Sequence, residues 1–341
     1  MKKILVTGGA GYIGSHTIVE LINNNCEVLA VDNLSNSSRK SIDAVYKITN
    51  KKVPLFECDM RDKRGLHRIL KSNQIDCIIH FAALKAVGDS VKNPEKYYDN
   101  NVNGAKILIQ AALDNDVNNF IFSSSATVYG REAKIPYKEE MQLGTPTSPY
   151  GETKVMIETM LSDKVKTNKN FSAVSLRYFN PIGAHESGLI GEDPNGIPDN
   201  LMPYISQVAI GKLQYLNVFG DDYPTEDGTC KRDYIHITDL ANGHIAAINW
   251  LLKNNHLIDL EVFNLGTGEA TSVFEVIKTF EDVTKRKIPF KISSKRAGDL
   301  PQFWADSSKA LEVLNWKPKY DIKKMIFDLW KWQSLNPNGY E

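Results

Sequence analysis

The sequence predicts an α/β protein built on a doubly wound parallel sheet, with a smaller α/β C-terminal lobe. Two observations support this prediction. In the first half of the 341-residue chain, short apolar runs alternate with longer amphipathic stretches. The apolar runs are continuous, as is typical of strands covered on both faces. Strand–helix–strand repetition of this kind predicts right-handed crossovers and a Rossmann-like sheet.

The elements of this sheet follow in order along the first half. The expected strands are 3–8, 26–32, 53–59, 77–83, 119–125 and 171–179. The expected helices between them are 12–24, 62–72, 100–114 and 150–165.

The composition changes after residue 180. The segment 180–200 is rich in Gly, Pro, Asp and Asn, and its length predicts a functional loop. We therefore divide the chain into a first domain over 1–180 and a smaller lobe over 181–341, with a segment near 234–265 returning to the first sheet. Helices are expected at 200–211, 238–253, 272–284 and 321–333, and strands at 261–265 and 288–292.

Charge and cysteine content exclude several classes of protein. Lys+Arg and Asp+Glu each number 41, so the charge balance gives no case for nucleic acid or an anionic membrane as main partner. Apolar runs are too short for a membrane span or a signal peptide. The cysteines form no Cys-x-x-Cys pair, and buried free thiols suit a reducing cytoplasm. The histidines lack ligand spacing, so we expect no metal site.

The glycines of TGGAGYIG, residues 7–14, lie between the first strand and the first helix. Residues without Cβ permit a tight turn and let the backbone approach a pyrophosphate, which the helix N-terminus attracts. Asp32 ends the second strand, where it can accept from ribose hydroxyls and repel a 2′-phosphate. The pattern favours NAD over NADP. A structural glycine turn beside a strand-end Asp is the alternative.

Tyr150 and Lys154 lie just after Pro149, which favours a helix start. They are four residues apart and share one helix face. A neighbouring ammonium and a positively charged nicotinamide would both lower the pKa of a tyrosine from its ordinary value near 10, which suits a general base. The same spacing recurs at Tyr320 and Lys324 without a preceding glycine turn, so we expect that pair to be an ordinary surface pair.

Ordered segments from residue 7 to residue 306 extend this pattern over nearly the whole chain. TGGAGYIGSH, HFAALKAVGDSV, FSSSATVYG, SPYGETK, RYFNPIGAH and RAGDLPQFWAD resemble the UDP-glucose 4-epimerases of the extended short-chain dehydrogenase/reductase superfamily. The resemblance implies an isomerase that interconverts UDP-galactose and UDP-glucose with bound NAD. C4 would be oxidised to a 4-keto intermediate, which rotates and is reduced again. It also implies a homodimer.

The resemblance implies roles for individual residues. Tyr150 would take the proton of the 4-hydroxyl with help from Ser125, while Lys154 would hold the nicotinamide ribose and lower the pKa of the tyrosine. The cofactor would be lined by Gly8, Gly11, Tyr12, Ile13, Gly14, Asp32, Asn33, Asn36, Asp59, Met60, Phe81, Ala82, Lys85, Asn100 and Tyr178.

The substrate would be held mainly by the second lobe. Arg232 and Arg296 offer fork-shaped donors to a diphosphate. Phe303 matches a sugar-pocket position whose bulk predicts discrimination against N-acetylated sugars. The implied substrate residues are Asn180, Asn200, Leu201, Asn217, Phe219, Arg232, Arg296, Asp299 and Phe303.

Three alternatives stay open at this stage. A nucleotide-sugar 4,6-dehydratase would want acids where this chain has Ala126 and Thr127. A UDP-glucuronate decarboxylase would want a pocket that matches a carboxylate. A catalytically silent NAD-binding regulator would be expected to lack Tyr150 or Lys154.

Overall fold

The computed structural model describes residues 1–254, 256–296 and 298–341. Seven parallel strands form the main sheet in the order β10-β6-β5-β4-β1-β2-β3. They are β1 (Lys3–Thr7), β2 (Glu27–Asp32), β3 (Leu55–Glu57), β4 (Cys77–His80), β5 (Asn119–Ser123), β6 (Ser172–Tyr178) and β10 (Glu261–Leu265). The doubly wound sheet expected from the continuous apolar runs is confirmed.

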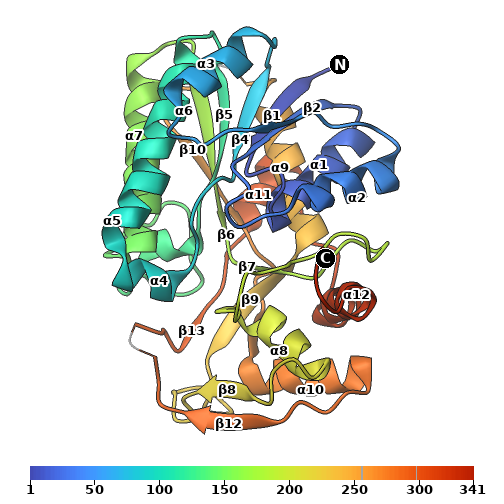
Figure 1. Ribbon diagram of the computed structural model, residues 1–341. Coiled ribbons are helices and arrows are strands. Elements are labelled where there is room, and N and C mark those ends of the chain that lie inside the picture. Colours follow the sequence, from blue (N-terminus) through green and yellow to red (C-terminus); the bar gives the residue numbers. More distant parts are fainter. Residues whose placement is uncertain (255, 297) are drawn as a thin grey trace.

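Helices cover both faces of this sheet (Figure 1). One face carries α1 (Tyr12–Asn23), α2 (Arg39–Thr49), α9 (Ile237–Leu251) and α11 (Ser308–Leu314). The other face carries α3 (Lys63–Lys71), α6 (Gly104–Leu113) and α7 (Pro149–Thr167). Shorter elements on this side are α4 (Val87–Lys92), α5 (Pro94–Tyr97), the π-helical η1 (Tyr98–Asn103) and the 3₁₀ turn η2 (Ala126–Tyr129).

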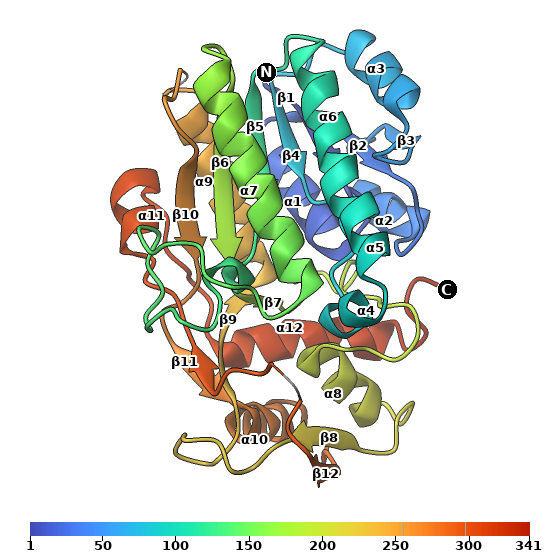
Figure 2. The same cartoon turned by 90° about the vertical axis from the view of Figure 1, so that its left-hand side faces the viewer.

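The smaller lobe packs below the carboxyl ends of the main-sheet strands (Figure 2). Its apolar core joins three helices and the strand β8 (Leu216–Phe219), with which the exposed strand β12 (Phe290–Ser293) pairs in parallel. The helices are α8 (Leu201–Ala209), α10 (Val273–Thr284) and α12 (Ile322–Leu335). A four-stranded sheet connects the two lobes and consists of β7 (Asn180–Ile182), β9 (Lys231–His236), β11 (Ala270–Ser272) and β13 (Gln302–Phe303).

The segment expected to return to the first sheet does so only in part. β10 pairs with β6 in the main sheet, and α9 packs on the face covered by α1. β9, which begins at Lys231, instead pairs with β7, β11 and β13. The charged Asp233 of β9 is fully buried, where its carboxylate accepts hydrogen bonds from the N–H groups of Thr267, Gly268 and Ala305.

The chain order of the main sheet reverses at β1, which lies between β2 and β4. The ends of β1 and β4 are joined by a 2.8 Å hydrogen bond between Thr7 Oγ1 and His80 Nδ1. Ligands of open α/β sheets bind outside the carboxyl ends of strands at such a reversal. Among the described helices, none combines the length and apolar content needed to cross a membrane.

Candidate active site

The glycine-rich turn after β1 is closely packed. Gly8 has a φ of +67°, which favours glycine, and a Cβ on Gly14 would lie 2.2 Å from the Gly8 carbonyl oxygen. α1 follows at once with Gly11 as its N-cap, and Tyr12 and Ile13 form its first turn. The free N–H groups of this turn can bind a pyrophosphate, so the turn fits a dinucleotide.

Asp32 supports this turn from the end of β2. Its carboxylate accepts from the Ala10 N–H at 3.0 Å, from the Leu34 N–H at 2.9 Å and from the Ser37 hydroxyl at 2.8 Å. The carboxylate is therefore fixed in place before any ribose arrives. Such preorganisation is what a strand-end acid needs in order to select ribose hydroxyls.

Two further predicted cofactor residues meet beside β2. Asn33 Nδ2 donates to Asp59 at 2.9 Å, and Arg61 holds the pKa of the Asp59 carboxyl well below its usual range. Met60 is buried beside Gly104, whereas Asn36 is exposed in the turn after β2.

The end of β4 carries a third set of predicted cofactor residues. The Phe81 ring lies 4.8 Å from the His244 ring, and the Ala82 N–H donates to Thr7 Oγ1 at 3.4 Å. Asn100 donates to Asn101, which in turn binds the backbone of Leu84.

Lys85 and Tyr12 connect the first domain to the loop that follows β7. Lys85 Nζ lies 2.7 Å from the carboxylate of Glu192, and the Tyr12 hydroxyl donates to the Gly183 carbonyl at 2.8 Å. Glu192 was not among the residues predicted from sequence. These contacts bring the long Gly- and Pro-rich loop over the dinucleotide turn.

Tyr150 and Lys154 lie on the buried face of α7, where their side chains are 8% and 3% exposed. Pro149 starts the helix, and the Ser148 hydroxyl caps it by accepting from the Gly151 N–H. Lys154 Nζ lies 5.7 Å from the centroid of the Tyr150 ring and donates to the Ser123 carbonyl at 2.7 Å. α7 thus presents both side chains to the carboxyl end of β5.

The pKa values of this pair differ from the sequence-based expectation. Burial raises the pKa of Tyr150 to about 12, and only the hydrogen bond with Ser125 opposes this rise. Burial also lowers the pKa of Lys154 to about 7, against the pull of Glu158. The expected lowering of the tyrosine pKa is therefore absent in the protein alone, because desolvation outweighs the hydrogen bond with Ser125.

Ser125 caps η2 directly after β5, where its hydroxyl accepts from the Thr127 N–H at 3.2 Å. Tyr178 reaches the same region from β6, and its hydroxyl accepts from Ser123 Oγ at 2.7 Å. Within the described part of the chain, Thr127 Oγ1 is buried without a hydrogen-bond partner, as is Asn180 Oδ1 in β7. Unpaired buried oxygens of this kind are suited to a polar ligand.

The predicted substrate residues of the second lobe form two cation–π pairs. The Arg232 guanidinium lies 4.6 Å from the Phe303 ring centroid, and the Arg296 guanidinium lies 4.9 Å from the Phe219 ring centroid. Asp299 accepts from Arg296 Nε at 2.9 Å and lies 3.7 Å from Arg232. This aromatic and basic surface suits a nucleoside diphosphate.

The other substrate residues frame these pairs. Asn217 accepts from Ser293 between β8 and β12 at 3.2 Å, and Asn200 and Leu201 begin α8. The Phe303 ring is parallel to the Tyr137 ring at 6.0 Å and lies 5.9 Å from the Phe179 ring. Its position is therefore fixed by neighbouring aromatic rings.

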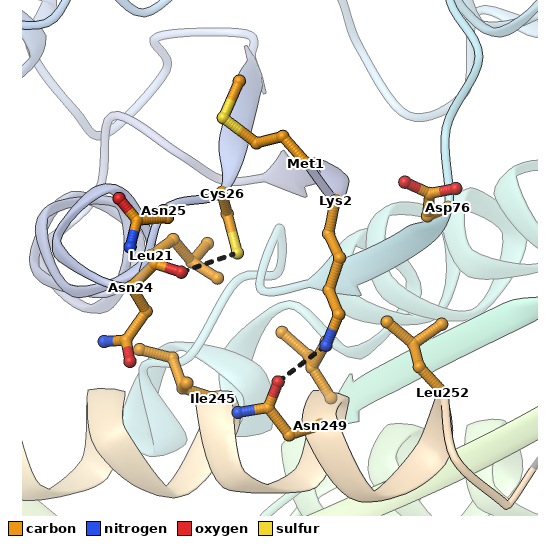
Figure 3. Close-up of a pocket in the computed structure, with 11 residues that line it drawn as sticks. Met1, Lys2, Leu21, Asn24, Asn25, Cys26, Asp76, Ile245, Asn249 and Leu252 are labelled. Carbon is orange, nitrogen blue, oxygen red and sulfur yellow. Dashed lines mark hydrogen bonds between the residues drawn. The ribbon is translucent and has the colours of Figure 1, made fainter.

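A separate pocket of about 520 Å³ lies at the opposite, amino ends of the strands (Figure 3). Lys2 donates to Asn249 there at 2.8 Å, and Cys26 lies beside Asn24. None of the predicted site residues lines it. All four cysteines are free.

Comparison with known proteins places these features in a family. A family model described as GDP-mannose 4,6 dehydratase matches residues 5–329. A UDP-glucose 4-epimerase of Neisseria meningitidis serogroup C is 52% identical over 341 residues, with 100% of each chain covered. One from Erwinia amylovora is 52% identical over 337 residues, with 99% of each chain covered.

The chain belongs to the UDP-glucose 4-epimerase family. The crystal structure of the family member from Bifidobacterium longum, in complex with NAD⁺ and UDP, has a TM-score of 0.96 to this chain. The two are 47% identical, and the alignment covers 99% of this chain and 100% of the other. The epimerase resemblance read from the sequence is thus confirmed.

A buried network behind Tyr150 was not predicted from sequence. Glu158 is 2% exposed and binds Arg177, Ser124 and Ser175. Two signals could have revealed it. Glu158 continues the four-residue spacing of Tyr150 and Lys154, and Arg177 is the one charge in an apolar strand run. A buried charge of this kind needs a partner.

Tyr320 and Lys324 differ from the surface pair expected. Tyr320 precedes the first residue of α12, and its ring lies 4.6 Å from that of His236. Lys324 binds the buried Asp328 at 2.7 Å. The four-residue spacing of Tyr320 and Lys324 therefore belongs to a structural ion pair at the start of α12.

Proposed function

We propose that this protein interconverts UDP-galactose and UDP-glucose by inverting C4 of the hexose while NAD remains bound. The observation that carries the proposal is the meeting of Ser125, Tyr150 and Lys154 at the carboxyl end of β5. This meeting occurs in a chain 52% identical to UDP-glucose 4-epimerases over its full length.

The residues of the first domain fit the dinucleotide. The N-terminus of α1 would bind the pyrophosphate, Asp32 the adenosine ribose, and Lys154 the nicotinamide ribose. Lys85 would donate to the cofactor phosphates, either in place of Glu192 or while still paired with it. When bound, NAD accepts a hydride from C4 and returns it to the opposite face of the same carbon.

Tyr150 is the residue best placed to take the proton of the 4-hydroxyl and to give it back. Its pKa of about 12 in the protein alone means that the phenolate requires help at neutral pH. The ammonium of Lys154, 5.7 Å from the ring centroid, supplies favourable charge, and Ser125 stabilises the phenolate by hydrogen bonding. A positively charged cofactor would add to this stabilisation.

The second lobe would bind the part of the substrate that does not react. Arg232 and Arg296 carry positive charge for the diphosphate, and Phe219 and Asn217 would enclose the uracil. Strong binding of UDP leaves the hexose free to present either face to the same base. Inversion of C4 within one site requires that the UDP be held tightly while the hexose is held loosely.

A product assay tests the proposal. Purified protein is incubated with UDP-galactose without added cofactor, and UDP-glucose is separated and quantified. The denatured protein is then assayed for released NAD. Formation of UDP-glucose together with released NAD is expected. A 4-keto-6-deoxy product would indicate a dehydratase, decarboxylation of UDP-glucuronate a decarboxylase, and bound NAD without turnover a regulator.

Ala126 and Thr127 favour the epimerase over the dehydratase that gives the matching family model its name. Both follow Ser125 in η2, where neither side chain offers the carboxyl that an elimination would use. Tyr150 therefore supplies a base, whereas positions 126 and 127 supply no carboxylic acid for an elimination.

We also propose a homodimer in the cytoplasm. The neighbouring helices α4 and α7 expose apolar side chains: Val87 and Val91 of α4 are 46% and 62% exposed, and Met156 of α7 is 46% exposed. Such an exposed apolar face supports burial against a second copy of the chain. The four free cysteines suit a reducing compartment. Sedimentation at micromolar concentration would give the mass of two chains.

A further inference from the structure

Glu158 is a buried acid that none of the predicted roles uses. It lies one helical turn beyond Lys154 and two beyond Tyr150 in α7 and is 2% exposed. Its carboxylate accepts from Ser124 Oγ at 2.6 Å and from Ser175 Oγ at 2.7 Å. It also accepts from Arg177 Nε at 3.0 Å and from Arg177 Nη2 at 2.6 Å. Both carboxylate oxygens are thus occupied.

These bonds join the elements that carry the catalytic groups. Ser124 directly precedes Ser125 at the end of β5, while Ser175 and Arg177 lie in β6 just before Tyr178. Arg177 also stacks over the Tyr129 ring of η2, with its guanidinium 4.9 Å from the ring centroid. One carboxylate therefore fixes α7 against β5, β6 and, through Arg177, η2.

The same carboxylate is the negative charge that acts on Lys154. Burial lowers the pKa of Lys154, and Glu158 raises it. Arg177 of β6 is also charged and is ion-paired to Glu158, whereas the other titratable groups nearby are neutral at physiological pH. Tyr150 of the same helix and Tyr178 of β6 have pKa values raised by burial, and His80 of β4 has a pKa lowered to about 3. The uncharged Phe122 ring and the Ser123 carbonyl of β5 complete the surroundings.

We propose that Glu158 is a positioning residue for epimerisation, which anchors α7 to β5 and β6 and keeps Lys154 in its ammonium form beside Tyr150. The effect of Glu158 on catalysis rests on the proposed function. A buried ion pair by itself is weak evidence for stability, because apolar replacements of such pairs are often neutral. A purely structural role for Glu158 would leave the protonation of Lys154 unchanged.

Two variants separate these roles. Glu158→Gln removes the charge but leaves Arg177 buried without its partner, which endangers folding. The double variant Glu158→Gln/Arg177→Gln removes both charges and restores neutrality. Asp328→Asn is the matched control, because Asp328 is equally buried and paired with His236 and Lys324 in α12, outside the site.

The readouts are the melting temperature, the pH profile of kcat, and the titration midpoint of Lys154 by NMR of ¹³C-labelled lysine in the protein as purified. In the folded double variant the Lys154 midpoint and the alkaline limb of the kcat profile are expected to move down by about one pH unit. Asp328→Asn is expected to change the melting temperature but neither midpoint.

A folded double variant with wild-type Lys154 titration and a wild-type kcat profile would overturn the inference. If the wild-type protein fails to convert UDP-galactose, the proposed function fails, but the Lys154 titration still decides whether Glu158 controls its charge. The two failures are therefore distinguishable.

Discussion

Lys154 Nζ donates to the Ser123 carbonyl at 2.7 Å and lies 5.7 Å from the centroid of the Tyr150 ring. A buried lysine held in this way is not a flexible surface cation. Its position is set by the end of β5, and it presents its charge to the one tyrosine that α7 directs into the site. The chemistry proposed for the chain depends on this pairing.

Replacement of Tyr150 by Phe removes the hydroxyl group that we propose takes the substrate proton as phenolate. We expect kcat for UDP-galactose to fall roughly 10²- to 10⁴-fold, the usual contribution of a general base. KM should change little, because the second lobe holds the UDP. Tyr320→Phe is the control, since Tyr320 has the same spacing to a lysine outside the site, and it should retain wild-type turnover. A Tyr150→Phe enzyme with near-normal kcat would contradict the assigned role.

Replacement of Lys154 by Met removes the charge that we propose favours the phenolate. Burial alone raises the pKa of Tyr150 to about 12, so the active base becomes scarcer as pH falls below that value. We expect kcat of this variant to be low at pH 7 and to rise continuously up to pH 10. Rates measured from pH 6 to pH 10 test this, with Lys324→Met as control. A loss of equal proportion at every pH would show that Lys154 acts in another way.

The main sheet and the helix α7 could be predicted from the sequence because both obey local rules. The strands from β1 to β6 are continuous apolar runs, and α7 carries its proline and serine start signals. β9 was not predicted, because its charged first residues form a strand only through pairing with β7, β11 and β13. α2 was not predicted either, although Ser38 caps this helix and Ile42 and Val45 share its buried face.

The site was predictable where residue types carry chemistry and unpredictable where tertiary packing decides. The glycine turn, Asp32 and Tyr150 stand in recognisable local contexts. The pairing of Lys85 with Glu192 joins residues from different lobes, and no local pattern indicates it. The direction of the Tyr150 pKa shift was missed for the same reason, since burial is a property of the whole fold.

Arg296 is expected to contribute to uniform binding of UDP. Its guanidinium lies 4.9 Å from the Phe219 ring centroid and is half exposed, open to a diphosphate. Arg296→Ala should raise KM for UDP-galactose roughly tenfold to a hundredfold, the value of a hydrogen bond to a charged group, with kcat nearly unchanged. Arg286→Ala is the matched control, because Arg286 also stacks on an aromatic ring, that of Trp330. A fall in kcat without a change in KM would refute this role.

Phe303 is expected to limit the size of the hexose. Its ring is held between Arg232 and the Tyr137 and Phe179 rings, so it cannot easily move aside for an N-acetyl group. Wild-type protein should prefer UDP-galactose to UDP-N-acetylgalactosamine. In Phe303→Ala the ratio of kcat/KM between the two sugars should shift toward the N-acetylated one by roughly 10- to 200-fold.

Phe274→Ala serves as the control for this prediction, since Phe274 pairs with Phe290 elsewhere in the second lobe. It should leave the ratio unchanged. Comparable wild-type turnover of both sugars would show that Phe303 is no barrier.

The most direct test follows the hydrogen at C4. UDP-galactose carrying deuterium at C4 is converted by the purified protein in ordinary water, without added dinucleotide, and the UDP-glucose formed is analysed by mass spectrometry and NMR. The account predicts full retention of deuterium at C4 of the inverted sugar, because the hydrogen that leaves this carbon returns to it. Loss of the label to solvent would contradict it, as would conversion that depends on dinucleotide supplied in stoichiometric amount.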